Sequence, residues 1–332
     1  MLMLKLPTMA EMPFHAAMMA DPATMSYNAP WYPPDGTIPF PEENWTAWLQ
    51  KWETPSAERF YAFLMNEQGE LVGECHWADY GASMGVVVKA EYRGRGYGHQ
   101  ALRLLIEQAF RYPEIDALLN TFEPDRDPAM ATFQRAGFVP VKVDGEGILH
   151  VRLTRERWQS LRRQEQLQEV YRAMCDWDAG NARRIHHFAK VHDFARQIGL
   201  ASGLDENGMF ILEIAALVHD IGIKPADAQY GRHDGPLQEQ LGEAAAQIML
   251  DAMGLPPAVV RRVSFLVGKH HTTSNVAGAD WQILLEADFL VNMVESSYPD
   301  EAIDRAEENL FRTAEGKRML ERIRNAEFGM RN

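Results

Sequence analysis

The pattern of hydrophobic and polar positions divides the chain into two parts of different character. As far as residue 154, short apolar or alternating segments are separated by turn residues, which predicts β-strands interspersed with helices. Beyond that point no strand pattern recurs, and apolar residues return every three or four positions, as on the buried face of a helix. The pattern therefore predicts an α+β domain at 1–154, a linker and helix start at 155–164, and an all-α domain at 165–332.

The individual elements follow from the same pattern. Strands are expected at 2–6, 59–66, 71–79, 84–89, 117–122, 139–143 and 148–153, and helices at 10–20, 45–52, 99–110 and 128–136. Residues 28–43 are rich in proline and aromatic side chains, which predicts a long loop that is either a lid over a functional site or a structural arm. In the second part, helices are expected at 155–177, 182–198, 208–220, 237–253, 257–271, 280–294 and 303–325.

The overall charge and the cysteines narrow the class of protein. With 33 basic and 47 acidic side chains, the net charge of −14 argues against binding to nucleic acid or to an anionic membrane. A small phosphorylated substrate is still compatible with this negative net charge, because a metal ion or a helix N-terminus supplies local positive potential. Cys75 and Cys175 predict neither a disulfide framework nor a cysteine-bound metal. Without a signal-peptide pattern or a membrane-length apolar run, we expect a cytoplasmic protein, with an oligomer possible.

A glycine-rich segment, Arg93-Gly94-Arg95-Gly96-Tyr97-Gly98, follows the β-branched run 86–88 and precedes an amphipathic helix. Closely spaced glycines let the backbone approach a phosphate, and the N–H groups of the new helix point at it. Arg93 and Arg95 add positive charge. This strand-turn-helix context favours a phosphate-binding turn over an ordinary surface turn, and it does not have the spacing of the dinucleotide-binding fingerprint.

These residues, together with the segment 129–138 (Ala-Met-Ala-Thr-Phe-Gln-Arg-Ala-Gly-Phe), resemble the GNAT N-acetyltransferase family over about residues 1–153. The resemblance implies a mixed sheet with flanking helices that binds acetyl-CoA and transfers its acetyl group to an amine. It also implies that the loop 28–43 lies over the acceptor site. By resemblance, the residues that bind the cofactor are Val87, Val88, Arg93, Gly94, Arg95, Gly96, Tyr97 and Gly98.

The chain departs from the family at the proton donor. Many members carry a tyrosine that protonates the departing thiolate, where this chain has Phe133, which cannot donate a proton. Water or Tyr97 is the expected substitute. For the general base the sequence offers Glu74, with His76 on the same strand face and Asp79 beyond it. Each of these is alternatively an ordinary strand residue.

Polar side chains interrupt apolar helix faces in the second part. His219 and Asp220 end the apolar run 210–218. His187 shares a face with Val191 and other apolar residues, whereas His186 lies on the polar, solvent-facing side of the same helix. Such groups are costly to bury unless each has a partner. Asp288 likewise sits on an apolar face, and His270 and His271 can both be placed on the apolar side of their helix. One divalent metal site would explain all of these positions together.

This ordered set resembles the HD superfamily of metal-dependent phosphohydrolases over about residues 165–320. The resemblance implies a helical bundle in which His187, His219, Asp220 and Asp288 bind one divalent transition metal, such as Mn, Fe, Co, Ni or Zn. His270 and His271 make a second ion possible, and His233 is a weaker candidate ligand. Asp220 could orient the nucleophile. Lys224 is either a phosphate contact or a solvated lysine.

The sequence therefore predicts a bifunctional protein. Its second part would hydrolyse a nucleotide or similar small phosphoester, and its first part would transfer an acetyl group to an acceptor amine. Two alternatives remain open at this point. In one, the first domain binds acetyl-CoA without turnover and regulates the hydrolase; in the other, the helical domain regulates acyl transfer.

Overall fold

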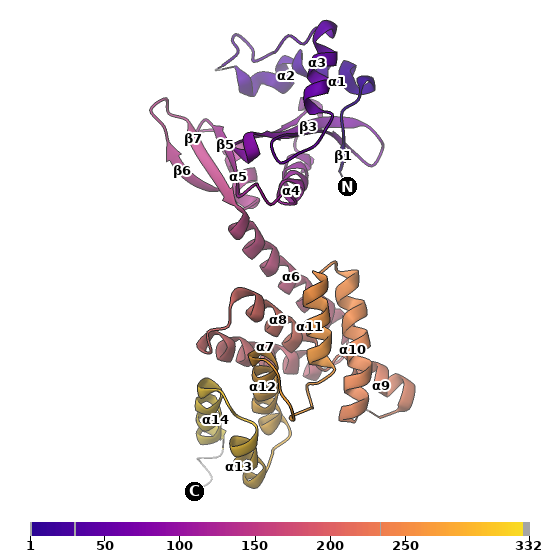
Figure 1. Ribbon diagram of the computed structural model, residues 1–332, viewed down its shortest axis with the longest axis vertical. Coiled ribbons are helices and arrows are strands. Elements are labelled where there is room, and N and C mark those ends of the chain that lie inside the picture. Colours follow the sequence, from indigo (N-terminus) through magenta and orange to yellow (C-terminus); the bar gives the residue numbers. More distant parts are fainter. Residues whose placement is uncertain (1, 30, 233, 328–332) are drawn as a thin grey trace. The chain divides into compact units, whose positions relative to one another are not determined.

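The structure is a computed structural model that describes residues 2–29, 31–232 and 234–327. The chain forms two compact units, Met1–Leu161 and Arg162–Asn332 (Figure 1). The continuous helix α6 (Arg155–Trp177) begins in the first unit and ends in the second. Each unit has its own hydrophobic core, as expected for chains of this length.

The first unit contains two antiparallel sheets (Figure 1). One has the strand order β1 (Met3–Lys5), β2 (Phe60–Met65), β3 (Leu71–Ala78) and β4 (Ser83–Val88), and the other has the order β5 (Ala117–Phe122), β7 (Leu149–Thr154) and β6 (Val139–Val143). The sheets contact each other at β4 and β5, where the described residues form no ladder of hydrogen bonds. The predicted combination of a sheet and flanking helices in this part is confirmed.

Helices cover both faces of the first sheet. The strand β2 is buried on both sides because its alternate residues enter two different apolar clusters. Ala62 and Leu64 pack with the apolar stripe of α4 (Tyr97–Ala109), whereas Tyr61 and Phe63 face α1 (Met12–Met19) and α3 (Trp45–Trp52). The remaining helices of this unit are α2 (Pro22–Met25) and α5 (Asp127–Arg135).

The second unit is helical, which confirms the predicted class of secondary structure. Its helices are α7 (Ala182–Ala201), α8 (Glu206–Val218), α9 (Ile223–Tyr230), α10 (Gly235–Ala252), α11 (Pro257–Val267), α12 (Ala279–Glu295), α13 (Asp300–Asn309) and α14 (Ala314–Glu327). Most of α8 is buried, and it packs against α7, α11 and α12. Among the described residues, every helix is too short or too polar to cross a bilayer.

The predicted helix 303–325 is wrong, because the chain forms α13 and α14 there with a break between them. The buried carboxyl group of Glu286 causes the break. It accepts hydrogen bonds from the backbone N–H groups of Arg312 (2.7 Å) and Thr313 (2.9 Å), and from the Thr313 hydroxyl. Phe311 is fully buried beside them. These N–H groups are therefore unavailable for a continuous helix.

Two further boundaries differ from expectation. The helix predicted at 257–271 ends at Val267, so His270 and His271 lie in a turn rather than on a helix face. The cause is Gly268 at the helix end, after which the His270 ring binds back to the Val267 carbonyl. Residues 223–230, which lie between the helices predicted at 208–220 and 237–253, form the short helix α9, whose eight residues have too little periodicity to be recognised.

We predict that Glu286→Ala lowers the free energy of unfolding of the helical unit by about 2–3 kcal/mol, because it removes a buried acceptor that binds two backbone N–H groups and a hydroxyl. Urea denaturation followed by circular dichroism measures the change. Glu308→Ala, an exposed change near the same break, is the matched control and should have almost no effect. Equal shifts for the two variants would contradict the assigned role of Glu286.

Candidate functional site

A polar pair lies on the face of β3 that α1 and α3 cover. The register places Glu74 opposite Phe63 and His76 opposite Tyr61, so all four side chains share this face. Glu74 is 4% exposed, and one of its oxygens (Oε2) lies 2.9 Å from Nδ1 of His15 on α1, which is itself 4% exposed. The Tyr61 hydroxyl lies 3.5 Å from the same nitrogen. Glu74, His15 and Tyr61 therefore each have a partner within this cluster, as burial requires.

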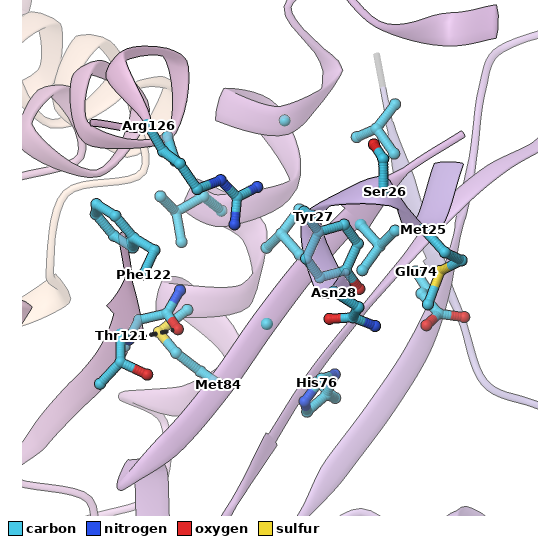
Figure 2. A pocket seen from close by; sticks show the side chains of 18 of the residues that line it. Met25, Ser26, Tyr27, Asn28, Glu74, His76, Met84, Thr121, Phe122 and Arg126 are labelled. Carbon is cyan, nitrogen blue, oxygen red and sulfur yellow. Dashed lines mark hydrogen bonds between the residues drawn. The ribbon is translucent and has the colours of Figure 1, made fainter. Parts of the chain in front are cut away.

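A cavity of about 1460 Å³ opens beside this pair (Figure 2). Figure 2 shows Glu74, His76 and Tyr27 among the side chains that line it, together with Arg126. The Arg126 guanidinium lies 5.3 Å from the centroid of the Tyr27 ring. The lining also includes the end of β4 and the start of α4 at Gly98, so the cavity connects the face of β3 with the glycine-rich turn.

Burial determines the ionisation of the groups in this cavity. Burial lowers the pKa of His76, and the charge of Glu74 only partly opposes it, so the imidazole is neutral. The His76 Nδ1 atom is buried and has no hydrogen-bond partner among the described residues. Burial and the nearby Glu74 charge raise the pKa of Tyr27 to about 12. The cavity therefore holds a neutral imidazole able to accept a proton.

The glycine-rich turn has an open side. Gly94 and Gly96 adopt φ of 78° and 80°, a left-handed conformation that favours glycine. A Cβ atom added at Gly94 or Gly98 would meet no atom within 4 Å. No side chain caps the first turn of α4, so its backbone N–H groups at this end can face a ligand.

The two arginines of the turn bind the protein's own backbone. The Arg93 guanidinium donates to the carbonyl oxygens of Ala23 (3.0 Å), Thr24 (2.6 Å) and Val88 (3.3 Å), and so ties the turn to α2. The Arg95 guanidinium donates to the Glu91 carbonyl (3.3 Å). The two guanidinium groups are therefore engaged by the protein, whereas the backbone of the turn has an open side. Arg93, Val87, Val88 and Gly98 line the cavity.

Phe133 also lines the cavity, and it packs on Phe122 and Phe138 with ring centroids 5.5 and 4.9 Å apart. This position on α5 thus presents a ring without a proton to donate. Tyr97 lies against Tyr92, with 6.4 Å between the ring centroids, and it is absent from the described lining of the cavity. Asp79 is likewise outside that lining.

In the helical unit, histidine side chains converge at the end of α8. His219 is completely buried, and its Nδ1 donates to the Ala216 carbonyl at 2.9 Å. His270 donates from Nδ1 to the Val267 carbonyl at 2.7 Å, and Nδ1 of His187 lies 3.2 Å from Glu295 Oε2. These partners assign the N–H to Nδ1 in each ring. In the neutral form of each ring, Nε2 therefore carries a lone pair toward the centre of the cluster.

Several distances within the cluster would fit the ligands of one metal ion. Nε2 of His187 lies 3.2 Å from Nε2 of His219, and Oδ1 of Asp288 lies 3.2 and 3.4 Å from these two nitrogens. Oδ2 of Asp220 lies 3.7 Å from both nitrogens. Ligand atoms about 2.1 Å from a shared metal ion are separated by about 3.0–3.5 Å. Two imidazole lone pairs at 3.2 Å would repel each other unless a proton or a metal ion lies between them.

Asp220 also joins a second group of ligands. Its Oδ1 lies 3.1 Å from Nε2 of His270, and Asp220, His270 and His271 offer atoms close enough to hold an ion. Burial opposes ionisation of Asp220, but the charges of His219 and His270 outweigh it and lower its pKa to about 2. Burial likewise disfavours the charged form of His187, yet Asp288, Asp220 and Glu295 raise its pKa. The cluster thus combines negative charge with inward lone pairs, a donor set that suits a divalent transition metal.

The other predicted residues of this unit lie outside the centre of the cluster. Lys224 is exposed and donates to the Trp177 carbonyl, with its Nζ 5.5 Å from the Trp177 ring centroid. His271 is exposed, and its Nε2 lies 2.9 Å from Gln238 Oε1. His186 is exposed on α7, whereas His187 is buried. His233 lies outside the described residues.

Two residues of these sites are not among those predicted from the sequence. Glu295 follows Asp288 by seven residues, which puts both on one face of α12, and this spacing was a usable signal. His15 stands in a short Met-rich helix with no pattern around it. Only the fold brings it to Glu74, 59 positions further along the chain.

Comparisons with known proteins concern the first unit. Residues 2–139 match the family model of the acetyltransferase (GNAT) domain. An uncharacterized N-acetyltransferase, YnaD of Bacillus subtilis (strain 168), is 25% identical over 117 residues, which cover 34% of this chain and 68% of that protein.

Two solved structures align with the same half of the chain. Spermidine N-acetyltransferase from Vibrio cholerae, in complex with CoA and spermine, aligns with a TM-score of 0.40 and 13% identity over 48% of this chain and 98% of that one. Aminoglycoside acetyltransferase AAC(6')-Ib, in complex with coenzyme A and kanamycin, aligns with a TM-score of 0.37 and 18% identity over 49% and 99%. The family match is the stronger finding, and by it the N-terminal part of this chain contains a GNAT acetyltransferase domain.

Proposed function

We propose that the first unit is an N-acetyltransferase that moves the acetyl group of acetyl-CoA to an amine. The observation that carries this proposal is the single cavity that joins the glycine-rich turn to the buried Glu74 and His76. The family match over residues 2–139 supports it. In this arrangement the open backbone of the turn binds the pyrophosphate, and the face of β3 receives the acceptor.

The residues on β3 handle the protons of the reaction. An ammonium must lose one proton before its nitrogen attacks the thioester carbonyl, and a second proton leaves as the C–N bond forms and the C–S bond breaks. Glu74 and the neutral His76 are the bases within this cavity that can take these protons. The departing thiolate takes one proton back. Because Phe133 cannot supply it, we assign that proton to water.

We propose a second activity, metal-dependent phosphoester hydrolysis, for the helical unit. The observation that favours it is the convergence of His187, His219, Asp220 and Asp288, with His270 joined through Asp220. When bound, a divalent ion would make hydroxide available near neutral pH and polarise a phosphoryl oxygen. A small phosphoester, such as a nucleotide, is the substrate class we propose.

The side chains around this cluster would have distinct roles. His187, His219, Asp220 and Asp288 would hold the first ion, and Asp220 with His270 and His271 could hold a second. Glu295 fixes the ring of His187 through Nδ1. Lys224 is bonded to the Trp177 carbonyl, so it would reach a phosphate only by leaving that partner.

Phe133 favours one alternative for the first unit. Without a tyrosine at this position, a domain that binds acetyl-CoA without turnover would act as a sensor that regulates the helical unit. Thiol release from acetyl-CoA over a panel of amines separates the two functions. Turnover of acetyl-CoA would exclude the sensor function, and binding of acetyl-CoA without any turnover would favour it.

We predict that Gly98→Leu raises the KM for acetyl-CoA at least about tenfold. A Cβ atom added at this position meets no protein atom within 4 Å and lies on the open side of the turn, so the melting temperature should not fall. Thiol-release kinetics measure the change. Gly145→Leu is the matched control, because its Cβ also meets nothing and it lies in another turn. Unchanged kinetics in Gly98→Leu would exclude this turn as the cofactor site.

We also predict that His187→Ala and Asp288→Ala each retain less than about a tenth of the metal bound by the unmodified protein. Elemental analysis after incubation with Mn, Fe, Co, Ni or Zn measures this, together with phosphate release from a panel of nucleotides. His186→Ala, one position away on the exposed face, should keep its metal. Full metal content in His187→Ala would exclude the proposed ligand set.

A further inference from the structure

Aromatic rings enclose one end of the cavity, which we call the acceptor end and define by its lining from α1, α3, β2, β3 and Phe40. Trp48 and Tyr61 have ring centroids 4.6 Å apart, and Trp52 and Tyr61 have centroids 5.3 Å apart. Phe40 and Trp48 each lie 4.7 Å from the His15 ring. All of these side chains line the cavity, so the acceptor end presents aromatic surface to whatever enters it.

The acceptor end offers a single acidic group. Among the described residues that line it, Glu74 is the one carboxyl-bearing side chain. The other acids of the lining, Glu123 and Asp125, follow β5 on the opposite side, and Glu123 pairs with Arg126 at 3.6 Å. A ligand with several ammonium groups would bury its additional charges here without carboxylate partners, which is costly.

The contacts around Glu74 fix the position of a carboxyl group that can bind one cation. Its Oε2 is bound to His15, whose ring is fixed between Phe40 and Trp48. On the same strand face, the His76 ring stacks on Tyr61, with centroids 5.7 Å apart, and its Nδ1 has no partner among the described residues. A carboxyl group and an unpartnered imidazole nitrogen thus lie at the base of an aromatic enclosure.

We propose that the acceptor is a primary amine with one positive charge on a flat, apolar ring system, and that Glu74 binds the ammonium while Trp48 and Trp52 stack on the ring. This inference rests on the proposed acetyl transfer and specifies its acceptor class. Aromatic stacking favours a flat body, and the single carboxyl group favours a single charge. His15 acts as a positioning residue that orients Glu74.

The test measures binding to the full-length protein by calorimetry, without acetyl-CoA. Tryptamine is the flat monoamine, indole is the uncharged ring and spermidine is the polyamine. We expect tryptamine to bind at least about tenfold more tightly than either of the others. Glu74→Gln should weaken the binding of tryptamine at least about tenfold and leave the binding of indole unchanged. Trp48→Leu should weaken the binding of both tryptamine and indole without affecting the binding of spermidine. Trp31→Leu is the matched control, since Trp31 is exposed and outside the cavity lining.

Several outcomes would overturn the proposal. Tighter binding of spermidine than of tryptamine would exclude the single-charge class, and equal effects of Trp48→Leu and Trp31→Leu would exclude stacking. The ligand ranking on the unmodified protein decides the matter even if a variant fails to fold. Thiol release is measured separately with the same amines. Tryptamine binding without any acetyl transfer would contradict the proposed transferase function and leave the ligand class standing.

Discussion

The burial of ionisable side chains on apolar faces is the constraint on which both units depend. Glu74 on β3 is 4% exposed and His219 at the end of α8 is 0% exposed, so each needs a partner inside the protein. In the first unit that partner is His15, supplied by a helix far away in sequence. In the second unit His219 lies among further histidine and aspartate side chains, whose mutual distances would fit the ligands of one shared ion.

The sequence predicts most elements because period-2 and period-3.6 patterns are local properties. The strands on either side of Glu74 and the helices that carry His187 and Asp288 are recognisable for this reason. The failures occur where a distant group decides the local structure. Glu286 breaks the predicted helix at 303–325 by binding backbone N–H groups 26 and 27 residues away, and no local pattern records that contact.

In the candidate sites, too, residues with a local signal in the sequence can be predicted, and residues brought in by distant contacts cannot. His187, His219 and Asp288 are anomalous within their own helices, so each can be selected from the sequence alone. His15 is not anomalous in a short helix, and the aromatic residues around it resemble ordinary core residues. The glycine-rich turn is recognisable from its sequence, but the direction of the Arg93 side chain is not, because its carbonyl partners belong to α2.

The Arg93 contacts have a consequence for how the two ends of the cavity communicate. Through its guanidinium the turn before α4 is bound to α2, and the residues that follow α2, from Ser26 to Ala29, form part of the cavity wall. A ligand that shifts this wall therefore also shifts the turn. Thermodynamic linkage makes such an influence mutual, so occupancy at one end changes affinity at the other by the same factor in both directions. Any coupling between ligands at the two ends would pass through the Arg93 contacts and through the Ala90 N–H, which donates to the Thr24 hydroxyl at 3.0 Å.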